Sequence, residues 1–149
     1  MNVLAALIAG IVGTVVMTLV MAMAPKMGVP KMDIVGLLGS MFGAPPNRAL
    51  GLLIHMMMGI VFGLVYAALW AAGLGAPTLL FGLLFGVVHW LIAGAMMAAI
   101  PMMHKGIKTG KVPAPGAYMT NNGGAMAFMG GLIGHVLFGL SVALVYAAF

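Results

Sequence analysis

The sequence predicts an all-α protein, an integral membrane four-helix bundle made of two parallel-related helical-hairpin repeats. The first observation behind this prediction is composition: 64% of the 149 residues are hydrophobic and 5% are charged, whereas about a quarter of the residues in a soluble domain are charged. The second is a set of four long stretches without a charged side chain. The third is an internal repeat. Together they exclude an ordinary soluble domain.

The four uncharged stretches have the length of membrane-spanning helices. They cover residues 3–24, 49–72, 78–100 and 124–149, and a helix crosses the ~30 Å hydrocarbon core of a bilayer with about 20 residues. The second and third stretches are separated only by the short glycine- and proline-containing segment 73–77, so they should form a helical hairpin with a tight turn.

The basic residues predict the orientation. All six lie in the first and third loops, residues 25–48 and 101–123, so by the positive-inside rule both loops are cytoplasmic and both termini lie outside. We expect this topology in the inner (cytoplasmic) membrane of a prokaryote. The net charge of +5 therefore indicates topology and not a nucleic-acid partner. The six residues are Lys26, Lys31, Arg48, Lys105, Lys108 and Lys111.

Two smaller features belong to the loops and helix ends. Asp33 is placed to cap a short interfacial helix over residues 34–42. Tyr66, Trp70 and Tyr146 lie near the outer ends of their helices, where aromatic side chains commonly anchor a protein at the membrane interface, so we expect them to serve as interface anchors.

The chain repeats itself. Residues 64–68 read Leu-Val-Tyr-Ala-Ala and recur at 144–148, and at the same offset His55 matches His135. At a slightly shorter offset, glycine, methionine and proline residues of the first helix match those of the third. Chance alignment of small and apolar residues is the alternative, but the coincidence of histidine, glycine, tyrosine and proline favours duplication.

The duplication divides one transmembrane domain, residues 1–149, into two repeats of about residues 3–72 and 78–149. A two-helix repeat crosses the membrane and returns, so its copies share one orientation and are related by an axis along the membrane normal. The membrane spans make membrane lipid an expected partner. We also expect the protein to assemble as a homo-oligomer or within a larger membrane redox complex.

Three histidines lie inside the predicted spans. His55 and His135 occupy equivalent helices at equal depth, and His89 lies near the middle of the third helix. Polar groups are costly in hydrocarbon and usually face a cavity, a partner or a cofactor. We therefore expect His55 and His135 to face each other, although hydrogen bonding between helices explains such histidines equally well. His104 lies at the boundary of the third loop, and its role stays open.

Small residues flank the two equivalent histidines at steps of four. A ridge of this kind leaves a flat slot beside each imidazole, wide enough for the edge of a porphyrin. Arg48, seven residues before His55, would then reach the haem propionates. The competing explanation is close helix packing, for which small residues at every fourth position are the usual device. The flanking glycines are Gly51, Gly59, Gly131 and Gly139.

These ridges resemble those of the bis-histidine b-type cytochromes, membrane four-helix bundles that hold haem between histidines on facing helices. The resemblance covers only the residues around His55 and His135; the chain otherwise reads like a small prokaryotic membrane protein. It implies haem b with His55 and His135 as iron ligands and His89 as a reserve ligand, and a function in electron transfer or as a redox accessory subunit.

Two other functions stay open. Seventeen methionines, among them Met17 and Met21 one turn apart, suggest transport or delivery of Cu(I) through thioether and imidazole ligands. The alternative explanation for the methionines is flexible apolar packing. The second open function is that of a structural subunit of a larger membrane complex, in which the histidines serve only packing. Asp33 is the only acidic residue, so acid–base catalysis by a carboxylate pair is excluded, and a binding protein or electron carrier is favoured over an enzyme.

Overall fold

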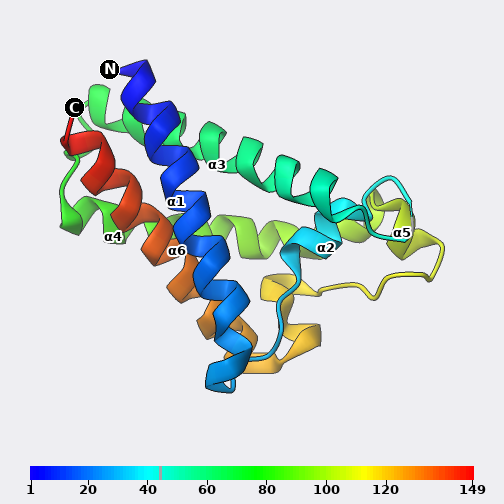
Figure 1. Cartoon of the computed structure of the whole chain (residues 1–149). Coiled ribbons are helices and arrows are strands. Elements are labelled where there is room, and N and C mark those ends of the chain that lie inside the picture. Colours follow the sequence, from blue (N-terminus) through cyan, green and yellow to red (C-terminus); the bar gives the residue numbers. More distant parts are fainter. Residues whose placement is uncertain (44) are drawn as a thin grey trace.

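A computed structural model describes residues 1–43 and 45–149, and it is built from helices. Four of them are long and apolar enough to cross a membrane (Figure 1). They lie within two residues of the predicted spans, except that the third ends as an α-helix earlier and continues as a 3₁₀-helix. The four helices are α1 Val3–Met23, α3 Arg48–Ala71, α4 Leu79–Met96 and α6 Gly124–Ala147.

The short helices lie between long ones in the chain, two in the first loop and three between α4 and α6. The predicted interfacial helix of the first loop is present as α2, and Asp33 caps it by accepting a hydrogen bond from the backbone N–H of Gly36 at 2.9 Å. The first loop ends at Asn47, whose side chain caps α3 in the same way. The short elements are η1 Ala24–Met27, α2 Ile34–Gly39, η2 Met97–Met102, α5 Lys105–Lys108 and η3 Ala117–Asn122.

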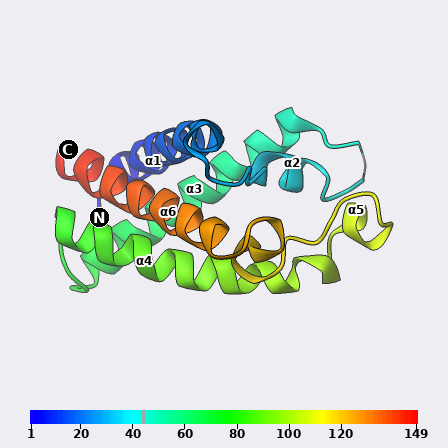
Figure 2. The same cartoon turned by 90° about the horizontal axis from the view of Figure 1, so that it is seen from below.

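Each repeat packs as a pair of helices, and one further contact joins the pairs. Helix α1 packs on α3, the equivalent α4 packs on α6, and α1 packs on α6 between the repeats. The termini and the turn after α3 lie at one end of the molecule, while α2 and α5 lie at the other (Figures 1 and 2). The backbone N–H of Asn2 donates to the Tyr146 hydroxyl at 2.9 Å, which ties the two termini together.

The predicted tight turn exists, but the helices that it joins separate. Gly73 and Gly75 adopt φ angles of 84° and 89°, which side chains with a Cβ rarely tolerate. Near the turn the two helices meet through aromatic side chains, and the rings of Trp70 in α3 and Phe85 in α4 stack with centroids 5.8 Å apart. The backbones of α3 and α4 do not run side by side, whereas α1 packs on α3 and α6 packs on α4. The predicted hairpin between the second and third spans is therefore present, but its helices diverge away from the turn, and the separation leaves room between α3 and α4.

Glycines allow the helices of each repeat to cross closely. A Cβ on Gly10 of α1 would lie 2.5 Å from the carbonyl oxygen of Gly59 in α3. At the equivalent crossing, a Cβ on Gly86 of α4 would lie 2.6 Å from the carbonyl oxygen of His135 in α6. The two repeats therefore use small residues at matching points to bring backbones together.

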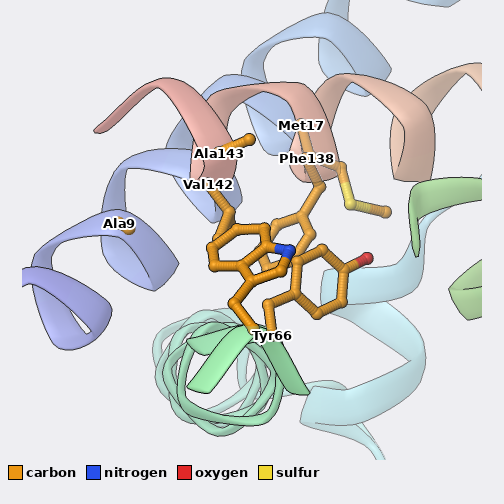
Figure 3. Close-up of a cluster of buried hydrophobic side chains, with 7 residues drawn as sticks. Ala9, Met17, Tyr66, Phe138, Val142 and Ala143 are labelled. Carbon is orange, nitrogen blue, oxygen red and sulfur yellow. The ribbon is translucent and has the colours of Figure 1, made fainter. Parts of the chain in front are cut away.

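The aromatic side chains expected at the membrane interface form part of the core instead. Tyr66 and Trp70 of α3 are 3% and 7% exposed, and they pack beside Phe138 and Val142 of α6 (Figure 3). The rings of Tyr66 and Phe138 meet edge to face, with centroids 5.9 Å apart. The interface-anchor prediction was wrong for these two residues, because α3 turns this face toward α1 and α6 and not toward lipid.

The outer faces of the long helices carry exposed apolar side chains. Leu19 of α1, Val61 of α3, Val88 of α4 and Leu144 of α6 are each at least half exposed. Such a surface would drive association in water, whereas lipid tails solvate it. The burial pattern therefore agrees with the apolar composition, and both indicate a membrane environment.

Candidate functional site

The space between α3 and α4 is an apolar cavity of about 320 Å³. Helices α1 and α6 contribute Thr14 and Phe138 to its walls, and its lining is almost entirely apolar. All three histidines predicted within the spans, His55, His89 and His135, reach this one cavity. The structure thus brings together the residues that the sequence singles out, from three different helices.

His135 presents a free nitrogen to the cavity. Its Nδ1 lies 2.8 Å from the carbonyl oxygen of Gly131, one turn earlier in α6, so Nδ1–H donates to that oxygen. In the neutral ring the proton is then on Nδ1, and Nε2 keeps its lone pair. Among the described residues, no group donates a hydrogen bond to this nitrogen.

His55 has the same protonation pattern by a different route. Its Nδ1 lies 3.3 Å from Oγ1 of Thr18 in α1. The Thr18 hydroxyl already donates to the carbonyl oxygen of Thr14 at 2.7 Å, so Oγ1 accepts from the imidazole N–H. Nε2 of His55 therefore also carries a lone pair. Histidines that bind metals or accept hydrogen bonds are commonly oriented in this way through the other ring nitrogen.

His89 is held mainly by aromatic rings. Its imidazole stacks on Phe62 with centroids 3.7 Å apart, and Nδ1 lies 3.4 Å from the Tyr66 hydroxyl. The His135 ring approaches it edge on at 4.7 Å. The closest imidazole pair is therefore His89 and His135, which are not equivalent in the repeats.

Trp90 completes the aromatic wall, although no pattern in the sequence singles it out. It is 1% exposed, and its ring lies 4.8 Å from that of His135. Its indole Nε1–H is buried without a hydrogen-bond partner in the part of the chain that the structure describes. Trp90 of α4 is the counterpart of Thr14 in α1 at the offset that relates these helices, and both line the cavity, so the two repeats differ at this position of its wall.

Methionines form much of the remaining wall. Met17 and Met21, the predicted copper ligands, both reach the cavity from α1. Met119 enters from the third loop, where it and Tyr118 have φ angles of 58° and 54°, an unusual backbone conformation for residues other than glycine. The methionines that line the cavity are Met17, Met21, Met41, Met58, Met96, Met97, Met103 and Met119.

Two of the predicted slot glycines serve helix packing away from the cavity. A Cβ on Gly51 would collide with the backbone of Val35 in α2, and one on Gly139 would collide with the backbone of Gly82 in α4. These collisions are between backbones of different elements, so the small residues there allow close approach of two helices.

The other two glycines lie at the cavity wall, but the space beside them is occupied. A Cβ on Gly59 would collide with the Thr14 side chain, and one on Gly131 would collide with the ring of Trp90. Arg48 makes two hydrogen bonds to Asp33, at 2.7 and 3.0 Å, and does not reach the cavity. The histidine nitrogens thus suit haem iron, whereas the glycine slots and the arginine do not suit the rest of the porphyrin.

The whole chain matches one family model. Residues 1–149 match the model described as a family of unknown function, DUF6789. The chain belongs to this family. No curated protein and no solved structure matches it.

The fourth histidine of this DUF6789 chain has a role outside the cavity. His104 is fully buried; its Nε2–H donates to the carbonyl oxygen of Leu37 at 2.8 Å, and its Nδ1 accepts from the backbone N–H of Ile107 at 3.1 Å. It therefore caps α5 and ties that helix to α2. Within residues 1–43 and 45–149, no three histidine, cysteine or acidic side chains form a group that could hold a metal ion.

Proposed function

We propose that this protein binds an apolar, hydroxyl-bearing aromatic molecule of the quinol class, taken from the membrane into the cavity between α3 and α4. The observation that carries the proposal is the pair of Nε2 lone pairs, on His55 and His135, in an otherwise apolar cavity. A lone pair on a neutral imidazole accepts a hydrogen bond, so the preferred ligand donates one.

The cavity supplies the other requirements of such a ligand. Its volume of about 320 Å³ is at the lower end of the range for small-molecule sites. Phe62, Trp90 and Phe138 offer ring faces and edges against which an aromatic ring packs. The separation of α3 from α4 gives an apolar tail a path toward the lipid. The expected redox role is kept in this proposal, with a diffusible quinol in place of a resident cofactor.

The test compares reduced and oxidised forms of one ligand. A short-chain benzoquinol and the corresponding quinone are titrated into protein in lipid nanodiscs, and binding is followed by tryptophan fluorescence. The quinol should bind more tightly, because the quinone has no O–H to donate. One hydrogen bond contributes about 0.5–1.5 kcal/mol, so His135→Phe should weaken quinol binding by up to about tenfold and leave quinone binding nearly unchanged.

Equal affinity for both forms, or an equal loss of both in His135→Phe, would refute this assignment. The same preparation tests haem b by its absorption spectrum. A Soret band that disappears in His55→Ala and His135→Ala would show that the cavity binds haem instead of a quinol.

We place both termini outside and the loops at the opposite end in the cytoplasm, following the distribution of basic residues.

Passage of Cu(I) is the second candidate, and the eight methionines at the cavity wall favour it. Thioethers and neutral imidazoles are the soft ligands that Cu(I) prefers. Met57 and Met58 give a matched pair for the test, because Met58 lines the cavity and Met57 is 57% exposed on the outer face. Met58→Leu should lower Cu(I) bound under reducing conditions and Met57→Leu should not; equal stoichiometry in both variants would exclude this function.

A further inference from the structure

A second pocket, of about 190 Å³, lies at the basic end of the molecule and is distinct in character from the cavity. Thr18 and Met21 of α1 form one side. Lys31 and Asp33, which precede α2, and Arg48, the first residue of α3, form the other. The pocket therefore collects three of the chain's seven charged side chains at the point where two long apolar helices end.

The charges in this pocket do not cancel. Asp33 is paired with Arg48 through both carboxylate oxygens, and this is the ion pair found in the described part of the chain. Lys31 also lines the pocket and has no such partner there. Two cations face one carboxylate, so the pocket has an excess of one positive charge and attracts anions.

The position of the pocket indicates where the anion comes from. Its wall includes Ala22 and Pro25, both exposed at the end of α1, so it opens on the side that apolar chains would cover. The end of a membrane-spanning helix lies at the depth of the lipid head groups. Lysine and arginine at this depth attract anionic lipids.

We infer that the pocket formed by Thr18, Lys31, Asp33 and Arg48 binds the phosphate head group of an anionic phospholipid whose acyl chains lie along α1. Asp33 sets the strength of this site, because its carboxylate competes with the phosphate for the Arg48 guanidinium. The pocket and the cavity share the wall residues Met21 and Ile34, and Thr18 of the pocket contacts His55 of the cavity.

Three variants test the inference by predicting changes of opposite sign. Protein in mild detergent is incubated with equal amounts of phosphatidylglycerol and phosphatidylcholine, and the retained lipid is counted by native mass spectrometry. Lys31→Gln should lower the preference for phosphatidylglycerol several-fold. Asp33→Asn should raise it several-fold, because asparagine still caps α2 while Arg48 becomes free. Lys108→Gln, with the same loss of charge in the other loop, should leave it unchanged.

The inference fails if Lys31→Gln and Lys108→Gln lower the preference equally, since that result reports only the net charge of the protein. It also fails if Asp33→Asn lowers the preference while helix content measured by circular dichroism is unchanged. Inorganic phosphate should not displace the lipid; displacement at millimolar concentration would assign the pocket to a free anion. His135→Phe should leave lipid retention intact, so this test and the quinol test fail separately.

Discussion

Replacing Gly86 with alanine should separate α4 from α6 and destabilise the protein. The added Cβ would lie 2.6 Å from the carbonyl oxygen of His135 and 2.8 Å from the Cα of Val136. Both neighbours are backbone atoms of another helix, so no side-chain rotation relieves the collision. Overpacking of this kind costs about 1–3 kcal/mol.

One effect opposes this cost. Alanine inside a helix is more favourable than glycine by about 0.5–1 kcal/mol. Because a collision between backbones belongs at the upper end of the overpacking range, the net destabilisation of Gly86→Ala should be about 2 kcal/mol. Gly10→Ala, at the equivalent crossing of the first repeat, meets the Gly59 carbonyl oxygen at 2.5 Å and should cost a similar amount.

The assay is unfolding in mixed micelles with increasing dodecyl sulfate, followed by tryptophan fluorescence. Trp90 and Trp70 are both buried and report on the two halves. Gly43→Ala is the control, because a Cβ there has no neighbour within 4 Å, and its free energy of unfolding should change by less than about 0.5 kcal/mol. If Gly86→Ala and Gly10→Ala are as stable as the wild type, the close-packed crossings do not exist and the shape of the cavity is wrong.

Three other predictions concern the basic end and the topology. The hydrogen bonds from Arg48 hold the pKa of Asp33 below its ordinary value of 3.8. The ion pair therefore stabilises the protein above that pH, and its contribution is lost as the pH falls through and below it. Arg48→Gln should flatten this part of the stability–pH profile and cost less than about 1 kcal/mol at neutral pH. His104→Ala should lower the free energy of unfolding by about 1–3 kcal/mol, because it leaves buried groups unpaired. It should also speed hydrogen exchange at the Ile107 and Lys105 amides, and unchanged exchange would contradict the tie between α2 and α5. The chain has no cysteine, so Leu74→Cys should react with an impermeant thiol reagent from outside intact cells and Lys108→Cys only after lysis; the reverse pattern would invert the topology.

Local physics accounts for the features that the sequence predicted well. An uncharged stretch of membrane-spanning length forms a helix because backbone polar groups must be satisfied internally in lipid. The Asp33 cap of α2 follows from the side chain and three residues of backbone. The pairing of His55 with His135 stays a prediction based on the duplication; the structure places both at the wall of the same cavity.

The failures concern relations between helices. The tight turn after α3 predicted the hairpin but not the divergence of its helices, because a turn controls only the direction of the chain and not which apolar faces meet. Tyr66 near a helix end suggested an interface anchor, whereas the rotation of α3 buries it beside His89. Small residues around the histidines are equally compatible with a cofactor slot and with helix crossing, and only the position of the neighbouring backbone distinguishes the two.

The sequence by itself determined the four helices, the Asp33 cap of α2 and the identity of the unusual polar residues, because each depends on the composition of one segment in its solvent. The tertiary structure decided that α3 and α4 separate, that three histidines and eight methionines share one cavity, and that Nδ1 of His55 and His135 is already engaged. Those outcomes depend on the rotation and crossing of helices in a uniformly apolar solvent, where every face of a helix is similarly hydrophobic and close packing alone selects the partner.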